Sequence, residues 1–194
     1  IFGGVTENGE TLNDVWEYSF KKSSWNKLET DGEVPVARWG HSAVIFQNEL
    51  WVFGGFTSSW NNDLYCLNLA TRKWRKVNSE GASTARHFHS ADVYNDKMYI
   101  FGGLSTKNLG DIKSFHFTTE KWQDVEATNS ISPRRGHQSL IYDHYLIIHG
   151  GRNNSEPSND LQFFDFETNT WETIKVDATA PTPRYFHSIG FWQN

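Results

Sequence analysis

The chain has 194 residues and a net charge of −5, and 37% of its residues are hydrophobic. It contains no run of 18 apolar residues, which excludes a helical membrane span. The acidic balance argues against a general nucleic-acid binder, because such proteins need a basic face. A lone cysteine, Cys66, excludes an internal disulfide and favours a reducing compartment, so we expect a cytoplasmic protein.

The chain opens on IFGG, and this glycine pair is the first landmark of a repeat that runs to the C-terminus. An Asp follows each pair by 8 to 10 residues, and a Trp follows the Asp by 11. A His comes 15 or 16 residues after the Trp, and the next glycine pair begins 13 residues after the His. The period of 48 to 51 residues indicates one supersecondary unit per repeat. The landmarks are Gly3, Gly4, Asp14, Trp25, His41, Gly54, Gly55, Asp63, Trp74, His89, Gly102, Gly103, Asp111, Trp122, His137, Gly150, Gly151, Asp160, Trp171 and His187.

Each repeat predicts four short antiparallel β-strands. In the first complete repeat, HSAVIFQN (41–48) and ELWVFGG (49–55) are nearly all apolar, as expected of inner strands covered on both faces. DLYCLNLA (63–70) keeps apolar residues at strand period, and KWRKV (73–77) is apolar only at intervals, as expected of a half-exposed outer strand. Radially packed four-stranded sheets satisfy this gradient, so the fold class is all-β.

We assign structural roles to the repeated landmarks. The glycine pairs close strand two, where backbones approach closely or φ is positive. The repeated Asp fixes the start of a loop through bonds to the backbone. The repeated His bonds a neighbouring loop, because equivalent positions around a propeller lie too far apart to share a metal. His149 stands where the other repeats have the Phe of FGG, and we expect a tolerated substitution there.

The phased glycine pair, Asp and Trp resemble the kelch repeat, and the start of each strand one resembles its Arg-x-x-His-Ser subtype. The resemblance implies a kelch-type β-propeller with four-stranded antiparallel blades. About four repeats are present, whereas kelch rings commonly have six or seven blades. The Tyr that usually lies six residues before the Trp is absent from all four repeats, which departs from the family pattern.

We therefore expect one propeller segment, with both ends cut from a longer protein. A four-bladed ring, closed by strands from the two ends, is the alternative. An open arc would expose two apolar faces, which the rest of the propeller or another copy of the chain must cover. The predicted parts are a partial blade at 1–30 (end of strand two to strand four), blades at 38–78, 86–126 and 134–176, and the first strand of another blade at 184–194.

The two intervals of variable length are loops that emerge at the same end of every predicted blade, because strand direction alternates along the chain. Loops borne on a rigid scaffold are where binding residues concentrate. An Arg lies three residues before each repeated His, and the kelch resemblance implies that such arginines bind acidic peptides or a terminal carboxylate. The alternative is that each Arg pairs with acidic residues of the loop before it. The expected partner-binding residues are Arg38, Trp39, Phe56, Trp60, Arg86, Phe88, Arg134, Arg135, Arg152, Arg184 and Tyr185.

The expected function is protein–protein interaction through this loop-bearing face, as a scaffold or substrate receptor within a larger protein. The partner would be a protein or an acidic peptide. We expect no enzyme, cofactor, metal site or catalytic residue, because no Ser/His/Asp arrangement stands out from the repeats. Neither the Cys–Tyr pair of copper–radical oxidases nor the iron motif of specifier proteins is matched. Two alternatives remain: a catalytic kelch propeller of one of these metal-dependent types, and a structural spacer without a ligand.

Overall fold

The computed structural model describes residues 1–175, 177 and 179–192, and this part of the chain consists of β-strands and connecting loops. The predicted all-β class with antiparallel blades is therefore confirmed. Contacts divide the chain into two compact units, Ile1–His87 (unit 1) and Phe88–Asn194 (unit 2). The predicted blade end at residue 176 and the last two residues of the segment 184–194 lie outside the described residues. Within the described part, no helix is long and apolar enough to cross a membrane.

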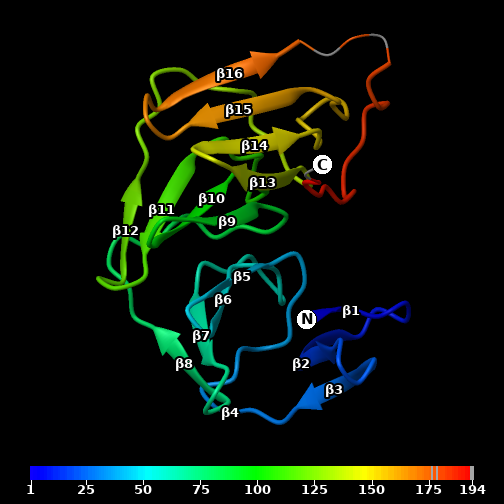
Figure 1. Ribbon diagram of the computed structural model, residues 1–194, viewed down its shortest axis with the longest axis vertical. Coiled ribbons are helices and arrows are strands. Elements are labelled where there is room, and N and C mark those ends of the chain that lie inside the picture. Colours follow the sequence, from blue (N-terminus) through cyan, green and yellow to red (C-terminus); the bar gives the residue numbers. More distant parts are fainter. Residues whose placement is uncertain (176, 178, 193–194) are drawn as a thin grey trace. The chain divides into compact units, whose positions relative to one another are not determined.

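Unit 1 contains two sheets, which we call blade 1 and blade 2 (Figure 1). Blade 1 has three antiparallel strands, and blade 2 has four antiparallel strands in sequence order. A two-residue strand from the loop between them adds to the outer edge of blade 2 in parallel, where the repeat predicts only a loop. The strands of blade 1 are β1 (Phe2–Val5), β2 (Thr11–Ser19) and β3 (Ser24–Leu28). The strands of blade 2 are β4 (Asp31–Gly32), β5 (Ser42–Phe46), β6 (Glu49–Phe53), β7 (Leu64–Asn68) and β8 (Lys73–Val77).

Unit 2 contains blades 3 and 4, each a four-stranded antiparallel sheet in sequence order (Figure 1). Blade 3 consists of β9 (Ser90–Tyr94), β10 (Lys97–Phe101), β11 (Ile112–His116) and β12 (Lys121–Asp124). Blade 4 consists of β13 (Gln138–Tyr142), β14 (Tyr145–His149), β15 (Leu161–Asp165) and β16 (Thr170–Ile174).

The hydrophobic core of each unit lies between its two blades. The same repeat positions contribute in both units, so that one face of a blade meets the opposite face of the blade that follows it. The buried members of these two clusters are Phe2, Val15, Val52, Tyr65, Leu67 and Trp74 in unit 1, and Phe101, Ile112, Leu146, Ile148, Phe164 and Trp171 in unit 2. Burial of these side chains is the main stabilising contribution that the sequence pattern provides.

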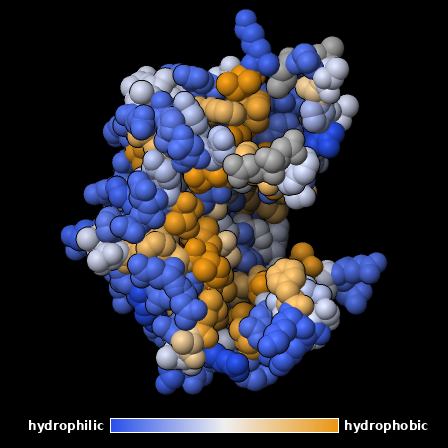
Figure 2. Space-filling view, viewed as in Figure 1, coloured by the Kyte–Doolittle hydropathy of each residue, from blue (hydrophilic) through white to orange (hydrophobic). Residues whose placement is uncertain are grey.

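Strands two and four show the predicted decrease in burial from the inner to the outer strands of a blade. The strand-two residues Trp51, Val52 and Phe53 are fully buried, whereas strand four of blades 2, 3 and 4 buries its Trp and exposes charged neighbours. Figure 2 shows hydrophilic atoms over the outer strand β12 and hydrophobic atoms farther in. The prediction is wrong for strand one of blade 2, where Ile45 is exposed. Ile45 faces a cleft beside blade 1, whose strand β1 pairs only with β2 among the described residues.

One face of blade 1 is not covered by the described residues. Trp25 is 52% exposed there, whereas its equivalent in blade 2, Trp74, is 3% exposed. Tyr18 and Phe20 lie beside Trp25 on the same face, with the Tyr18 ring 5.1 Å from the Trp25 ring. This face is one of the two apolar faces that the repeat pattern predicts to be open.

The glycine pairs end strand two where the chain passes close to the start of a strand one. Gly55 has a φ of +93°, and a Cβ atom there would lie 2.9 Å from the Cβ of His41 and 3.0 Å from the Trp39 carbonyl oxygen. Glycine is therefore required for both its positive φ and its small size. The N–H of Gly55 also donates to the carbonyl of Arg86, which ties strand two to the next loop.

Candidate partner-binding site

The two variable loops meet at one end of a blade in both units. In blade 2, Trp39 and Phe56 exchange backbone hydrogen bonds of 3.2 and 2.8 Å. In blade 4, Arg135 and Arg152 form the same bridge, with bonds of 3.0 and 2.9 Å. We call the side chains around these bridges the rim. The rim of unit 1 is Trp39, Phe56, Trp60 and His87, and the rim of unit 2 is Phe88, Arg135, Arg152, Tyr185 and Phe186.

Arg38, at the entrance to strand one of blade 2, is buried beneath the rim rather than exposed on it. Only 1% of Arg38 is exposed, and its Nη1 and Nη2 atoms donate to the carboxylate of Asp63 over 2.6 and 3.2 Å. Nη1 also donates to the carbonyl of Gly54 at 2.9 Å. The side chain thus ties the loop entering strand one to the loop leaving strand two.

Arg134 makes the same set of bonds in blade 4. It is 2% exposed and donates to both oxygens of Asp160, at 2.6 and 2.8 Å, and to the carbonyl of Gly150. Burial raises the pKa of Asp160, but hydrogen bonds from Arg134, Ser158 and Gln162 outweigh it and lower the pKa to about 2. The lowered pKa keeps the Asp160 carboxylate ionised at neutral pH, opposite the charged Arg134.

Burial also removes Arg86 from a partner's reach, since none of its surface is exposed and its guanidinium bonds Thr84 and Ser83. The structure thus assigns Arg38, Arg86 and Arg134 to the scaffold rather than to partner contact. The alternative prediction is that each Arg pairs with an acidic residue of the loop just before it, and Arg38 and Arg134 do not do this. Their guanidinium groups bond the repeated Asp, 25 or 26 residues later. The constant spacing of Arg and Asp in these repeats is the sequence feature that could have predicted the pair.

Arg184, the fourth repeated Arg, is exposed, and it donates to the carbonyl and hydroxyl of Thr182. It lines a cavity of about 350 Å³ in unit 2 together with His149 and His187. Nδ1 of His149 and Nε2 of His187 lie 3.0 Å apart, within hydrogen-bond distance. Burial, followed by neighbouring positive charge, lowers the pKa of His149. The substitution of His for Phe at this position therefore creates a polar contact that the repeat pattern alone does not predict.

Two further repeated histidines, the half-buried His41 and the buried His137, have a lowered pKa and are neutral at pH 7. Burial and the charge of Arg38 lower the pKa of His41 to about 4, and burial and Arg134 lower that of His137 to about 3. Nε2 of His137 lies 3.0 Å from the hydroxyl of Ser90, a residue of the preceding blade. These contacts agree with the predicted scaffold role of the repeated His.

One group of possible metal ligands lies at the opposite end of blade 4, in the turns. The ligand atoms of His144, Asp165 and Glu167 lie within 4.8 Å of one another. Asp165 accepts the N–H of Glu167 at 2.7 Å and the hydroxyl of Thr168 at 2.9 Å. The bonds of an ordinary turn thus hold Asp165 near Glu167, and a backbone bond from Phe166 to the carbonyl of His144 brings the neighbouring turn beside them.

The rim of unit 1 is aromatic. The Trp39 ring lies 5.4 Å from the Phe56 ring and 5.5 Å from the His87 ring, and Phe56 contacts Trp60 at 6.2 Å. Trp60 is 38% exposed, and Trp39 and Phe56 are half-buried. His87 is buried beneath them and was not predicted as a rim residue.

The rim of unit 2 is basic and aromatic. Arg135 donates to the side-chain oxygen of Asn108 at 2.8 Å, and the guanidinium of Arg152 lies 5.8 Å from the centre of the Tyr185 ring. In the described part of the chain, neither Arg135 nor Arg152 contacts a carboxylate. Both are half-buried, and Tyr185 is 41% exposed. Two arginines joined by a backbone bridge therefore have no carboxylate partner among the described residues.

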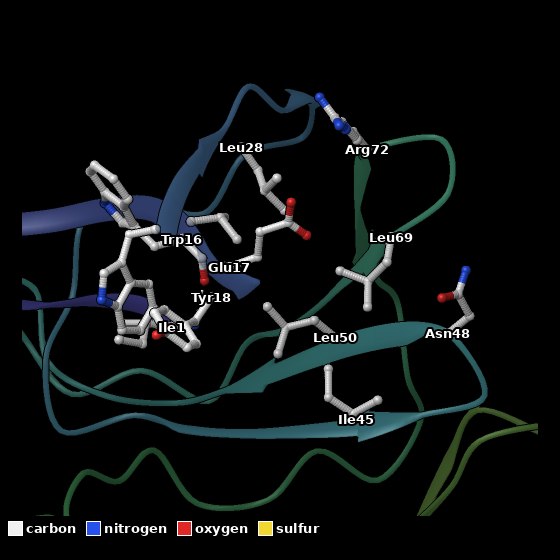
Figure 3. Close-up of a pocket in the computed structure, with 12 residues that line it drawn as sticks. Ile1, Trp16, Glu17, Tyr18, Leu28, Ile45, Asn48, Leu50, Leu69 and Arg72 are labelled. Carbon is white, nitrogen blue, oxygen red and sulfur yellow. Dashed lines mark hydrogen bonds between the residues drawn. The ribbon is translucent and has the colours of Figure 1, made fainter. Parts of the chain in front are cut away.

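A cleft of about 560 Å³ lies between blades 1 and 2 beside the core of unit 1, with Leu28, Leu50 and Leu69 in its wall (Figure 3). Glu17 and Arg72 are its charged lining residues. The cleft extends to the turns at the end opposite the rim, where Arg72 lies. Its lining provides apolar packing surface and does not bring together acid, base and nucleophile.

A family model described as the KLHDC2/KLHL20/DRC7 Kelch-repeats domain matches residues 1–194. Tip elongation aberrant protein 1 of Schizosaccharomyces pombe is 37% identical over 87 residues, which is 42% of this chain and 8% of that protein. A leucine-zipper-like transcriptional regulator 1 homolog of Drosophila melanogaster is 33% identical over 89 residues, or 42% of this chain and 9% of that protein. Kelch domain-containing protein 10 of Xenopus tropicalis is 32% identical over 88 residues, which is 43% of this chain and 21% of that protein. The match thus spans less than a quarter of each relative.

Proposed function

Because the chain belongs to the kelch-repeat family, we propose that it is a protein-interaction module whose rim binds a partner protein. Relatives named as a transcriptional regulator and as a kelch domain-containing protein support an interaction role over a catalytic one. The finer proposal is that the rim of unit 2 binds an acidic segment of that partner, so that the chain acts as a scaffold or substrate receptor.

The observation that carries this proposal is that, among the described residues, the guanidinium groups of Arg135 and Arg152 have no carboxylate partner. The chain as a whole carries a charge of −5, so two arginines joined by a backbone bridge, with no carboxylate partner in the described part of the chain, are a local exception. Guanidinium groups bind carboxylates through charge-assisted, often bidentate hydrogen bonds. The loops that bear them are anchored by the buried Arg134–Asp160 pair, so the binding geometry is preorganised.

The test is the affinity of a fluorescein-labelled peptide of four glutamates around one leucine, measured by fluorescence polarisation. Substituting Arg135→Gln and Arg152→Gln together should weaken binding roughly 10- to 100-fold, because each charged hydrogen bond is worth about 1–3 kcal/mol. The matched control is Arg72→Gln, which removes an exposed Arg at the opposite end of blade 2 and should leave the affinity unchanged. Equal affinities for all three proteins would refute the proposal that Arg135 and Arg152 bind an acidic segment, and a wild-type protein that binds no peptide would favour a spacer role.

A further inference from the structure

The position two residues after the repeated Arg has an unusual backbone conformation. Its occupants are Gly40, Phe88, Gly136 and Phe186, with φ values of +64°, +57°, +61° and +55°. Glycine adopts this left-handed region freely, whereas a bulky L-residue there is strained. Blade repeats that use glycine show that the fold itself does not need a side chain here. Strained residues that persist in a structure cluster at binding and active sites.

In unit 2 the strained residues bring two phenylalanine rings together over a glycine. The N–H of Gly136 donates to the carbonyl of Phe88 at 2.9 Å, and the N–H of Phe186 donates to the carbonyl of Gly136 at 2.7 Å. The Phe88 and Phe186 rings lie 4.4 Å apart. A Cβ atom on Gly136 would lie only 2.7 Å from the Phe186 ring, so glycine at 136 is what lets the rings meet.

The ring pair continues into the rest of the unit 2 rim. The Tyr185 ring lies 5.1 Å from the Phe186 ring, and Arg152 lies over Tyr185. Phe186 is 52% exposed and Tyr185 is 41% exposed, so the surface is apolar and accessible. We call Phe88, Tyr185 and Phe186 the aromatic platform. It borders the two arginines that lack a carboxylate partner.

We propose that the aromatic platform binds an apolar side chain of an acidic peptide segment, whose carboxylates contact Arg135 and Arg152. This inference rests on the proposed function and names its ligand more closely: acidic residues flanking one large apolar residue. Burial of apolar surface against rigid aromatic rings gives affinity, and neighbouring charges orient the segment. A single-stranded nucleic acid also offers negative charge and stacking bases, but it needs a basic groove along its backbone. Two arginines in a chain of charge −5 do not form such a groove.

The experiment compares three fluorescein-labelled peptides in which four glutamates flank a central Trp, Leu or Ser. Wild-type protein should bind the Trp and Leu peptides at least roughly tenfold more tightly than the Ser peptide. Phe186→Gly should abolish this difference while keeping the weaker, salt-sensitive binding common to all three peptides. The variant relieves the strained φ at 186, so it should remain folded, and circular dichroism checks this. The matched control is Phe20→Gly, which removes an exposed ring of unit 1 and should leave the preference intact.

The outcomes separate this inference from the function on which it rests. A preference for Trp and Leu that survives in Phe186→Gly overturns the platform but leaves the acidic-segment proposal standing. Wild-type protein that binds all three peptides equally also overturns the platform, whatever the variant does. Failure of every peptide to bind, or binding that Arg135→Gln with Arg152→Gln does not weaken, overturns both. Displacement of the peptides by a micromolar single-stranded oligonucleotide of thymidines would assign the surface to nucleic acid instead.

Discussion

Blades 2 and 4 join their loops through the same backbone bridge but present different chemistry on it. The bridge is Trp39 with Phe56 in blade 2 and Arg135 with Arg152 in blade 4. Beneath both bridges, a buried Arg holds the repeated Asp and a glycine carbonyl with nearly identical distances. The repeat therefore fixes the backbone that supports the rim and leaves the rim side chains free to vary. Binding specificity then resides in residues that do not repeat.

The largest expected effect separates two adjacent arginines. Arg134→Ala should destabilise the protein by about 3–5 kcal/mol, because it empties the space of a nearly fully buried side chain and leaves the half-buried Asp160 carboxylate without its partner. Arg135→Ala should change stability by less than about 1 kcal/mol, since its side chain bonds only the Asn108 amide. Urea denaturation of both variants measures the difference. Similar losses of stability in the two variants would mean that the rim residue Arg135 supports the fold as much as the buried Arg134 does.

A second comparison uses the repeated Trp in its two environments. Trp74→Ala should destabilise unit 1 by about 3–5 kcal/mol, because it leaves a cavity in the core between blades 1 and 2. Trp25→Ala, at the equivalent but exposed position, should have an effect below about 1 kcal/mol. Guanidinium denaturation of the two variants tests this. A large loss for Trp25→Ala would show that its face is covered in solution.

The strand-one position held by Val44 in blade 2 and Leu140 in blade 4 is an acid, Asp92, in blade 3. Burial raises the pKa of Asp92 to about 6, although a hydrogen bond from Ser139 lowers it in part. A folded pKa above the ordinary value of 3.8 means that ionisation destabilises the fold, and stability is lost as pH rises from about 4 through 6. Asp92→Asn should therefore raise stability at pH 7 by roughly 1–3 kcal/mol, with little effect at pH 4. Melting temperatures at the two pH values measure this, and an equal effect at both would contradict the raised pKa.

The smallest expected effect on stability comes from exchanging rim chemistry. Trp39→Arg with Phe56→Arg should cost about 1 kcal/mol, because the bridge between these residues is made by backbone atoms. The variant should gain affinity for acidic peptides at blade 2. Unchanged affinity, in a protein with a native circular dichroism spectrum, would show that the two arginines alone do not make an acidic-segment site.

The strand pattern, the core and the meeting of loops at one end follow from the sequence, because periodic apolar residues and alternating strand direction determine them. Which arginines would be buried could not be read from their position before the repeated His alone. Arg134 and Arg135 are neighbours in the chain, yet Arg134 is buried and bonds Asp160, whereas Arg135 is half-buried and bonds Asn108. The role of Phe186 could not be predicted from the sequence for the same reason. Its positive φ and its ring contact with Phe88 depend on a backbone geometry that the residue type does not reveal.

The most direct test of a variable rim on a repeated scaffold is amide hydrogen exchange, mapped with and without the Glu-rich leucine peptide. The account predicts slower exchange at residues 135–136, 152–157 and 184–186, which form the rim of unit 2 and its flanking loops. It predicts no change at the turns at 47–48 and 70–72, which lie at the opposite end of blade 2. Protection confined to those turns, or spread evenly over the strands, would contradict it.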